Sequence, residues 1–261
     1  MSIQVNICKC VLSSVVFILA VSCSVKEDRS GCPCMLMLDF SNVDKSLHVS
    51  EVCVTSESGF IYQAAVPSSE YDKLHIFKIP SVNVFLNVFS GIEGNFNPER
   101  GVTVSEGMDF PPLYLYSYEF DPETEVLTLP VFMHKEYCGI TLFVKADGPF
   151  SYSLSVEGDV CGVGLSGEMI DGPFRFSPVR ISDGKYHMRV PRQKSPSLVL
   201  KIYEDDSVLR TFAIGEYIVE SGYDWQAENL ADVEVEIDYS RTEVVFSVDD
   251  WEKTITFDVE I

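Results

Sequence analysis

Cations are scarce in this sequence. Its 261 residues contain 19 Lys and Arg against 40 Asp and Glu, which gives a formal net charge of −21 at pH 7. Nucleic-acid binding depends on clustered Lys and Arg that contact phosphates, and the sequence contains no such cluster. The same deficit disfavours electrostatic attachment to anionic lipid, so any membrane association must be covalent or apolar. The composition therefore excludes nucleic acid as a partner.

The apolar run near the N-terminus is short. It covers residues 11–20 (VLSSVVFILA), whereas a membrane-spanning helix needs about 20 apolar residues, so the run is typical of a signal-peptide core. The following Leu19-Ala20-Val21-Ser22-Cys23 resembles the bacterial lipobox, although Ala20 replaces the more common leucine. We therefore predict a lipoprotein signal peptide over residues 1–22 and a lipid on Cys23. An ordinary signal peptide followed by an incidental cysteine is the alternative.

Cysteine and histidine are too sparse for a disulfide framework or a clear metal site. With Cys23 lipidated, the mature chain keeps five thiols, an odd number that is thinly spread. Cys32-Pro33-Cys34 has no second close pair of Cys or His to complete a tetrahedral site. We predict no metal and no cofactor. The thiols are Cys32, Cys34, Cys53, Cys138 and Cys161.

Helical periodicity is also nearly absent, and residues 216–220 are the best short helix candidate. Short runs of β-branched and aromatic residues, many alternating with polar residues, instead predict strands separated by turns. A break near 130–136 divides the chain into a tether (23–34), an N-terminal β-sandwich (35–134) and a C-terminal β-sandwich (135–261). The predicted strands are residues 35–40, 49–54, 60–62, 74–79, 82–88, 113–116, 126–129, 140–146, 152–156, 186–190, 198–203, 208–214, 233–239, 244–248 and 255–261.

The chemical motifs are weak. Gly162–Gly167 fits G-x-G-x-x-G, but residues 168–173 contain Gly and Pro and cannot open the helix that a dinucleotide site requires, so we predict a glycine-rich loop. No nucleophile elbow or acid/base pair stands out, and we predict no catalytic residue. Asp205-Asp206 and Asp249-Asp250 are interpreted as solvated turns, with calcium binding as an alternative. Trp225 and Trp251 are either packed or sugar-stacking, and packing is favoured because each adjoins strand-like sequence.

Both ends of the chain resemble a known family. Residues 23–34, running into Met35-Leu36-Met37-Leu38-Asp39-Phe40, are similar to the start of mature FimB-like fimbrial anchor lipoproteins of the Bacteroidales. The far end has a similar order of motifs. These are Gly222-Tyr223-Asp224-Trp225, Asn229-Leu230-Ala231-Asp232-Val233, Ile237-Asp238-Tyr239 and Asp250-Trp251-Glu252.

This resemblance implies an all-β fold of two transthyretin-like Greek-key β-sandwich domains in series. It also implies a subunit at the base of a surface fimbrium, bound to the outer membrane through Cys23 and joined to fimbrial stalk subunits by strand exchange. In strand exchange, backbone hydrogen bonds supply the affinity and alternate side chains fill pockets. The alternation of Val244–Val248 and Ile255–Ile261 suits edge pairing, but the last hairpin of any sandwich would share it.

Two shorter segments resemble signals used in the same bacteria. Lys26-Glu27-Asp28 is similar to an acidic tag for surface export, with a plain hydrophilic tether as the alternative. Asp206-Ser207-Val208 resembles an O-glycosylation acceptor, which would modify Ser207, with a chance tripeptide in a turn as the alternative.

The sequence therefore favours a non-enzymatic anchor of a surface fimbrium. A surface glycan-binding lipoprotein with two β-sandwich modules is the alternative, in which exposed Trp and Tyr would stack on sugars. Only two Trp occur in the chain, against 12 Tyr and 17 Phe. A secreted hydrolase ranks third, because no recognisable nucleophile or metal set is present.

Overall fold

The computed structural model describes residues 33–59, 61–92, 94–97, 99–122, 124–145, 152–238, 243–248 and 251–256, the last two ranges as backbone alone. Apart from one short helix and two 3-10 turns, η1 (Lys45–Leu47) and η2 (Ser68–Glu70), its regular elements are strands. They form four sheets. The all-β class is therefore confirmed.

The first half of the chain builds two of these sheets. A three-stranded sheet has the order β4-β1-β9 and faces a five-stranded sheet of order β10-β8-β5-β2-β3. β1 lies between an antiparallel β4 and a parallel β9. The strands are β1 (Cys34–Asp39), β2 (Val49–Ser56), β3 (Ile61–Pro67), β4 (Leu74–Ile79), β5 (Val84–Ser90), β8 (Tyr114–Phe120), β9 (Val126–Pro130) and β10 (His134–Lys135).

Side-chain alternation explains why these two sheets face each other. In β1, Cys34, Leu36 and Leu38 are fully buried, whereas Met35 and Met37 point to the opposite face. Because a strand turns successive side chains to opposite faces, this pattern gives β1 one core-facing side. The buried residues of β1 and β4 pack against Val52 and Val54 of β2 and their neighbours on β5 in one hydrophobic cluster.

The second half builds the other two sheets. One has the order β14-β15-β11-β18-β19-β20, and the other has the order β17-β16-β12-β7-β6 with β13 paired to β12. The strands are β11 (Tyr137–Lys145), β12 (Ser153–Val163), β13 (Met169–Phe176), β14 (Val179–Ser182), β15 (Lys185–Pro191), β16 (Val199–Glu204), β17 (Ser207–Phe212), β18 (Val233–Asp238), β19 (Glu243–Val248) and β20 (Trp251–Thr256).

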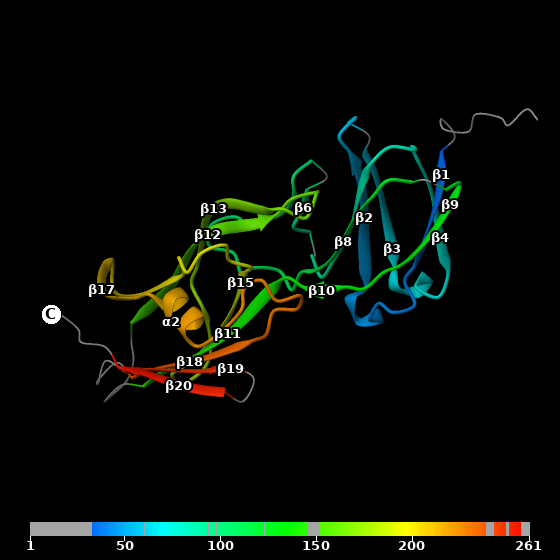
Figure 1. Cartoon of the computed structure of the whole chain (residues 1–261). Helices are drawn as coiled ribbons and strands as arrows, with labels where there is room; N and C mark the ends of the chain where they lie inside the picture. The colour runs from blue at the N-terminus through cyan, green and yellow to red at the C-terminus, as the bar shows by residue number, and fades with distance from the viewer. Residues whose placement is uncertain are drawn as a thin grey trace, which may run out of the picture.

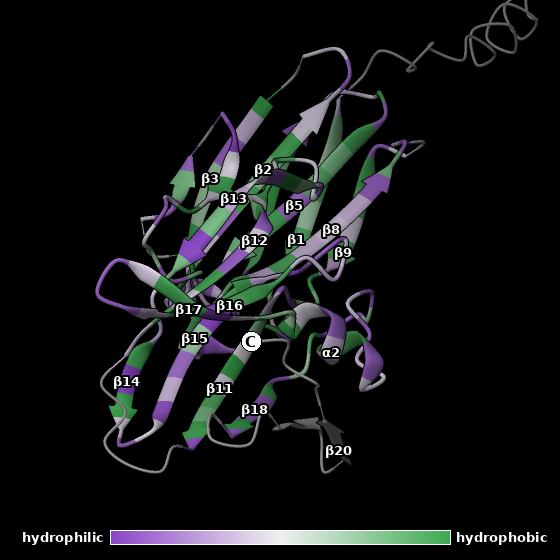
Figure 2. Ribbon diagram, turned by 90° about the vertical axis from the view of Figure 1, so that its left-hand side faces the viewer, coloured by the Kyte–Doolittle hydropathy of each residue, from purple (hydrophilic) through white to green (hydrophobic). Residues whose placement is uncertain are grey.

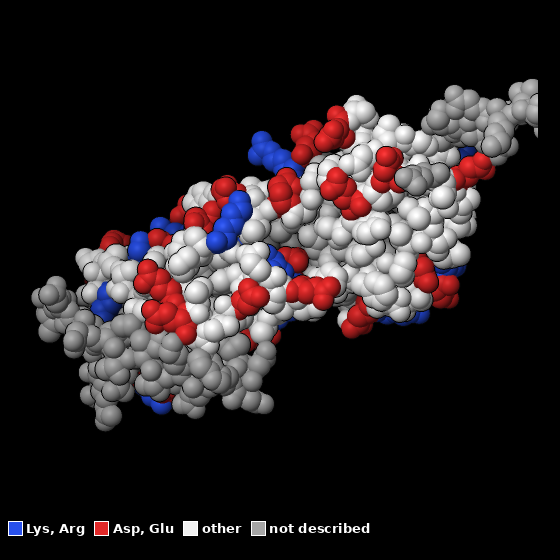
Figure 3. All heavy atoms as spheres, viewed as in Figure 1, with Lys and Arg blue, Asp and Glu red and all other residues white. Residues whose placement is uncertain are grey.

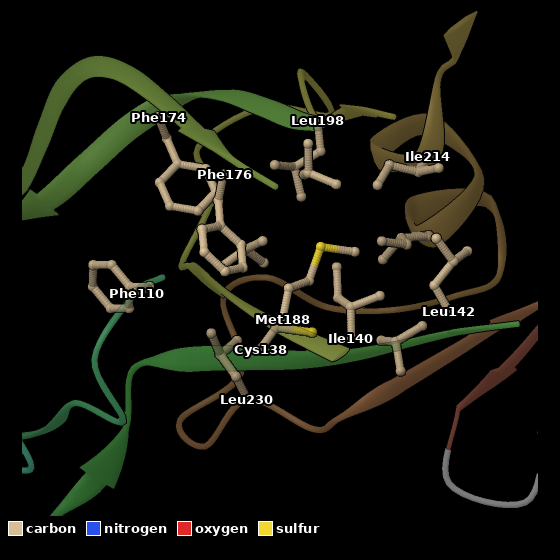
Figure 4. Packing of buried hydrophobic residues seen from close by; sticks show 14 of the residues in the cluster. Phe110, Cys138, Ile140, Leu142, Phe174, Phe176, Met188, Leu198, Ile214 and Leu230 are labelled. Atoms are coloured by element: carbon tan, nitrogen blue, oxygen red, sulfur yellow. The ribbon is translucent and has the colours of Figure 1, made fainter. Parts of the chain in front are cut away.

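A second hydrophobic core fills the space between these sheets. Ile140 and Leu142 of β11 meet Met188 of β15, and Leu198 and Ile214 close the cluster from the other side (Figure 4). Hydrophobic and hydrophilic residues alternate along β11 and β15 in Figure 2, as expected of strands with one buried face.

The short helix α2 (Ile214–Glu220) covers one part of this core. It buries Ile214 and Ile218 and lies against the segment that enters β16. A side chain at Gly215 would bring a Cβ within 2.6 Å of the Pro196 carbonyl oxygen, so only glycine permits this approach. The predicted helix at 216–220 is thus confirmed, although it begins two residues earlier, at Ile214.

Two short strands cross from the first half of the chain to the second. β6 (Phe96–Asn97) and β7 (Gly101–Thr103) pair with each other, and β7 pairs with the end of β12. The sequence placed residues 96–103 in the N-terminal sandwich, yet they extend a sheet of the second half. Runs of two and three residues carry no alternation signal, so their partner is decided by tertiary contacts alone. The domain bounds 35–134 and 135–261 stay a prediction.

Most of the expected strands are confirmed, including 74–79 with identical bounds. The strands β6, β7, β10, β13 and β14 were not predicted, because they are short or contain Gly and Pro. β20 begins at Trp251 rather than Ile255, since Trp251 already pairs with Val248 across the hairpin. Residues 257–261 of the predicted last strand lie outside the described residues.

Replacement of Leu36 by alanine tests the orientation of β1. Leu36→Ala deletes a fully buried side chain, and we expect a loss of about 2–5 kcal/mol in the free energy of unfolding. Met37→Ala, on the opposite face of the same strand, should cost about 1 kcal/mol or less. Urea unfolding of both variants measures the difference, and equal losses would contradict the assigned orientation.

Candidate functional site

The outer face of the three-stranded sheet is apolar and exposed. Met37 of β1 pairs with Ile76 of β4, and Met35 pairs with Val126 of β9, so these side chains share one face. Ile76 is 51% exposed, and Val126 and Leu74 are each 53% exposed. Leu74 lies on the same face as Ile76, two residues earlier in β4. Contiguous exposed apolar side chains of this kind mark interaction surfaces in soluble proteins.

This sheet also has two open edges. Within the described residues, β4 and β9 each pair only with β1, so one side of each strand leaves its backbone N–H and C=O groups without a strand partner. Such an edge can accept an added strand from another chain. The described chain begins at this sheet, at the right-hand end of the molecule in Figure 1.

A further open edge lies toward the other end of the molecule. β18, β19 and β20 form an antiparallel meander beside β11, and β20 is the outermost strand of its sheet. Figure 1 shows this meander at the lower left, far from β1. The two ends of the molecule therefore each present a strand edge.

A polar clamp fixes the short connection between β10 and β11. The Arg192 guanidinium donates from Nε to Glu136 Oε2 at 2.6 Å and from Nη2 to Oε1 at 3.1 Å. Its Nη1 also donates to the Trp225 and Ala227 carbonyl oxygens at 2.5 and 2.8 Å. Arg192 and Glu136 are only 11% and 15% exposed, so this two-pronged pair is largely shielded from water.

The adjacent residue, Lys135, is held from the same side. Its backbone N–H donates to Asn229 Oδ1 at 2.9 Å, and its carbonyl accepts from Leu230 N at 3.1 Å. Its ammonium lies 2.5 Å from Asp232 Oδ1. The loop between α2 and β18 therefore immobilises the connection at Lys135 as well as at Glu136.

The turn between β12 and β13 makes a second contact between the halves. Asn87 of β5, 1% exposed, donates from Nδ2 to the Leu165 carbonyl oxygen at 2.6 Å and accepts from Ser117 Oγ of β8. Gly167 has φ +81°, and a Cβ there would approach Ser117 Oγ to 2.6 Å. The glycine-rich loop predicted over Gly162–Gly167 is therefore only partly correct, because Gly162 lies within β12 and only Gly164–Gly167 form the turn.

The other predicted site residues are dispersed. Ser207 starts β17 and is exposed, directly after a turn in which Asp205 has φ 50°, so the turn predicted at Asp205-Asp206 is confirmed. Trp225 is 6% exposed and packs edge-on against Tyr223 at 4.8 Å between ring centroids. Packing of Trp225 is thus confirmed, and its alternative use as an exposed sugar platform is wrong.

Several predicted features lie outside the described residues. They are the signal peptide, Cys23, the segment 26–28, Cys32, Asp249-Asp250 and the side chain of Trp251. Modification of Ser207 and lipidation of Cys23 stay predictions. In the described part of the chain, no helix is long and apolar enough to cross a membrane.

The described thiols are structural in character. Cys34, Cys53 and Cys138 are buried and unpaired, and Cys161 is partly exposed and unpaired. Burial raises the pKa of Cys138 to about 12 and also raises the pKa of Cys53. These thiols are therefore neutral at pH 7, and neutral buried thiols are inert as nucleophiles. Among the described residues, no group of three or more His, Cys, Asp or Glu is arranged to hold a metal ion.

The surface charge follows the composition. Figure 3 shows acidic side chains distributed over both halves of the face in view, with Lys and Arg lying singly among them. Several of the cations are engaged by neighbouring acids, such as Lys194 with Asp171 at 2.6 Å and Lys201 with Glu157 at 2.6 Å.

Comparison with solved structures identifies the fold. The fimbrial anchor protein Mfa2 from Porphyromonas gingivalis superposes with a TM-score of 0.61 at 9% identity, over 85% of this chain and 99% of that chain. This chain has the fold of a fimbrial anchor protein. The all-β, β-sandwich fold expected from the resemblance is thereby confirmed.

Two further structures share the fold. A candidate polysaccharide-binding protein from Bacteroides thetaiotaomicron matches with a TM-score of 0.62 at 12% identity, covering 85% of this chain and 98% of that one. A candidate adhesin from Bacteroides ovatus matches with a TM-score of 0.62 at 10% identity, covering 86% and 96%. No protein-family model and no curated protein matches the sequence.

Removal of the Arg192 charge tests the clamp. Because Arg192→Met leaves the shielded Glu136 carboxylate without its partner, we expect a loss of about 3–5 kcal/mol in the free energy of unfolding. Lys194→Met breaks the exposed pair with Asp171 and should cost about 1 kcal/mol or less. Denaturant unfolding gives the energies, and hydrogen exchange at residues 134–137 reports the connection. Unchanged exchange in Arg192→Met would contradict a clamping role.

Proposed function

We propose that this chain is a non-enzymatic lipoprotein subunit of a surface fimbrium. A lipid on Cys23 holds it in the outer membrane, exposed at the cell surface, and strand complementation joins it to a neighbouring fimbrial subunit. The observation that carries this proposal is the fold shared with a fimbrial anchor protein over nearly the whole of that protein. The lipobox-like segment at residues 19–23 supports it.

The arrangement of the chain suits an anchor. β1 begins at Cys34, and the segment from Cys23 to Cys34 could extend about 36 Å, so the first sheet would stay near the membrane. The edge strand β20 lies toward the opposite end of the molecule, away from that sheet. A lipid at one end and a pairing edge at the other would place the two attachments of an anchor on opposite sides.

The clamp at Arg192 supports a mechanical role. Part of a load applied at the lipid would pass from the first half of the chain to the second through residues 131–136. Hydrogen bonds from Arg192, Asn229 and Leu230 hold this connection, and the contact of Asn87 with Leu165 adds a second link. Two links resist bending better than a single flexible linker, which would leave the halves free to move.

The alternative as a glycan-binding surface lipoprotein is weaker. One of the fold neighbours is a candidate polysaccharide-binding protein, so the fold by itself is compatible with this alternative. Of the two Trp residues that the alternative relied on, Trp225 is buried in the second core.

Palmitate labelling of cells tests the lipid anchor. The thioether-linked lipid requires the Cys23 thiol, so Cys23→Ala should lose all label and appear in the soluble fraction. Cys32→Ala, in the same tether, is the matched control and should label and fractionate like the wild type. Equal labelling of Cys23→Ala and wild type would refute lipidation at this residue.

Mild cross-linking of whole cells followed by capture of a tagged copy tests the fimbrial partner. We expect mass spectrometry to find another two-domain β subunit within a detergent-resistant ladder, and this ladder should leave the membrane fraction in the Cys23→Ala strain. Recovery of the tagged chain together with a glycan transporter, and without a ladder, would favour the glycan-binding alternative.

A further inference from the structure

A pocket of about 550 Å³ opens beside the start of β2. Its walls come from η1, from the first residues of β2, and from the chain that leaves β5 toward β6. Most of the lining is apolar: Leu47, Val49, Ile92, Phe96 and Pro112. A volume in this range accommodates a small ligand or a few side chains of a partner.

One acidic side chain lines this otherwise apolar pocket. Glu51 of β2 pairs with Phe89 of β5 and Ala65 of β3, which places its side chain on the outer face of the five-stranded sheet. Its carboxylate has no hydrogen bond or ion pair to any described residue. Burial raises the pKa of Glu51, with no compensating donor. Desolvation of a charge without a partner is unfavourable, and a cation placed beside it would offset that cost.

The backbone at the mouth of the pocket is also unusual. His48, which lines the pocket next to Val49, has φ 59° and ψ −60°. This region is unfavourable for a residue other than glycine, and such conformations concentrate at ligand clamps. Of the described residues that line the pocket, the other titratable one besides Glu51 is His48, which is exposed. Among the described lining residues, the pocket thus offers one carboxylate to a ligand.

We propose that this pocket receives a lysine or arginine side chain from a protein partner. The aliphatic stem lies along Leu47, Ile92 and Phe96, while the cationic head forms a charge-assisted hydrogen bond with the Glu51 carboxylate. Lys and Arg combine the two properties that the lining requires, because their methylene stems are apolar and their ends are charged. The acidic surplus of the whole chain, with 40 acids against 19 cations, also favours the approach of a cationic partner. The site does not depend on the lipid anchor.

Blocked tripeptides test the proposal on the full mature chain. The probes are Ac-Leu-Lys-Leu-NH2 and its matched neutral form, in which the lysine is acetylated. Methyl NMR of labelled Leu, Val and Ile reports binding directly at Leu47, Val49 and Ile92. We expect saturable shifts with the lysine peptide at millimolar concentration and at least tenfold weaker binding of the acetylated form.

Glu51→Gln supplies the second test. It removes the charge and keeps the shape, so lysine-peptide affinity should fall at least tenfold. Because the folded-state pKa of Glu51 is raised, its charged form disfavours folding above that pKa, and Glu51→Gln should be at least as stable as the wild type at pH 7. Glu57→Gln, an exposed acid just after β2, makes the same change in net charge and should leave affinity unchanged.

Four outcomes would overturn the proposal. They are absence of any methyl shift with the lysine peptide, equal binding of the acetylated peptide, unchanged affinity in Glu51→Gln, and binding of glucosamine in place of the peptide. The last outcome would assign the pocket to an amino sugar. None of them bears on lipidation at Cys23, so failure here leaves the anchor proposal intact.

Discussion

The ion pair between Arg192 and Glu136 fixes the short connection through which the chain passes from β10 to β11. The second hydrophobic cluster also includes Cys53 of β2, Phe89 of β5 and Leu115 of β8, so apolar packing joins the halves as well. Arg192 uses both prongs of its guanidinium on Glu136 and a further nitrogen on two carbonyl oxygens of the loop after α2. A planar donor with this many N–H groups can tie a linker, a carboxylate and a loop at one point.

The hydrogen bond from Asn87 to Leu165 joins the halves at another place, where strands β5 and β8 meet the turn between β12 and β13. The turn at Leu165 approaches β5 and β8 so closely that Gly167 has no room for a side chain. β7 adds a further connection, since it leaves the first half and completes a sheet of the second. The apolar residues of this crossing segment, including Val102 and Phe110, belong to the large second cluster. The two halves are therefore joined by backbone pairing, by packing and by charge.

The described part of the molecule presents several surfaces suited to recognition by another protein. The described thiols are protonated and mostly buried, and the polar residues beside the clamp are engaged with one another. The surfaces that a partner could contact are the exposed apolar side chains of the first sheet, the open strand edges, and the pocket that contains the Glu51 carboxylate. These are the features through which one protein subunit recognises another.

The sequence by itself determined the all-β class, most strand positions, the short helix, the turn at Asp205-Asp206 and the packing of Trp225. Each of these follows from local alternation or turn chemistry, which neighbouring residues carry. Tertiary structure alone decided that residues 96–103 join the second half, that Arg192 meets Glu136, and that Glu51 faces an apolar pocket. Those pairings unite segments far apart in the chain, and their partners are set by sheet register and core packing, which no local pattern encodes.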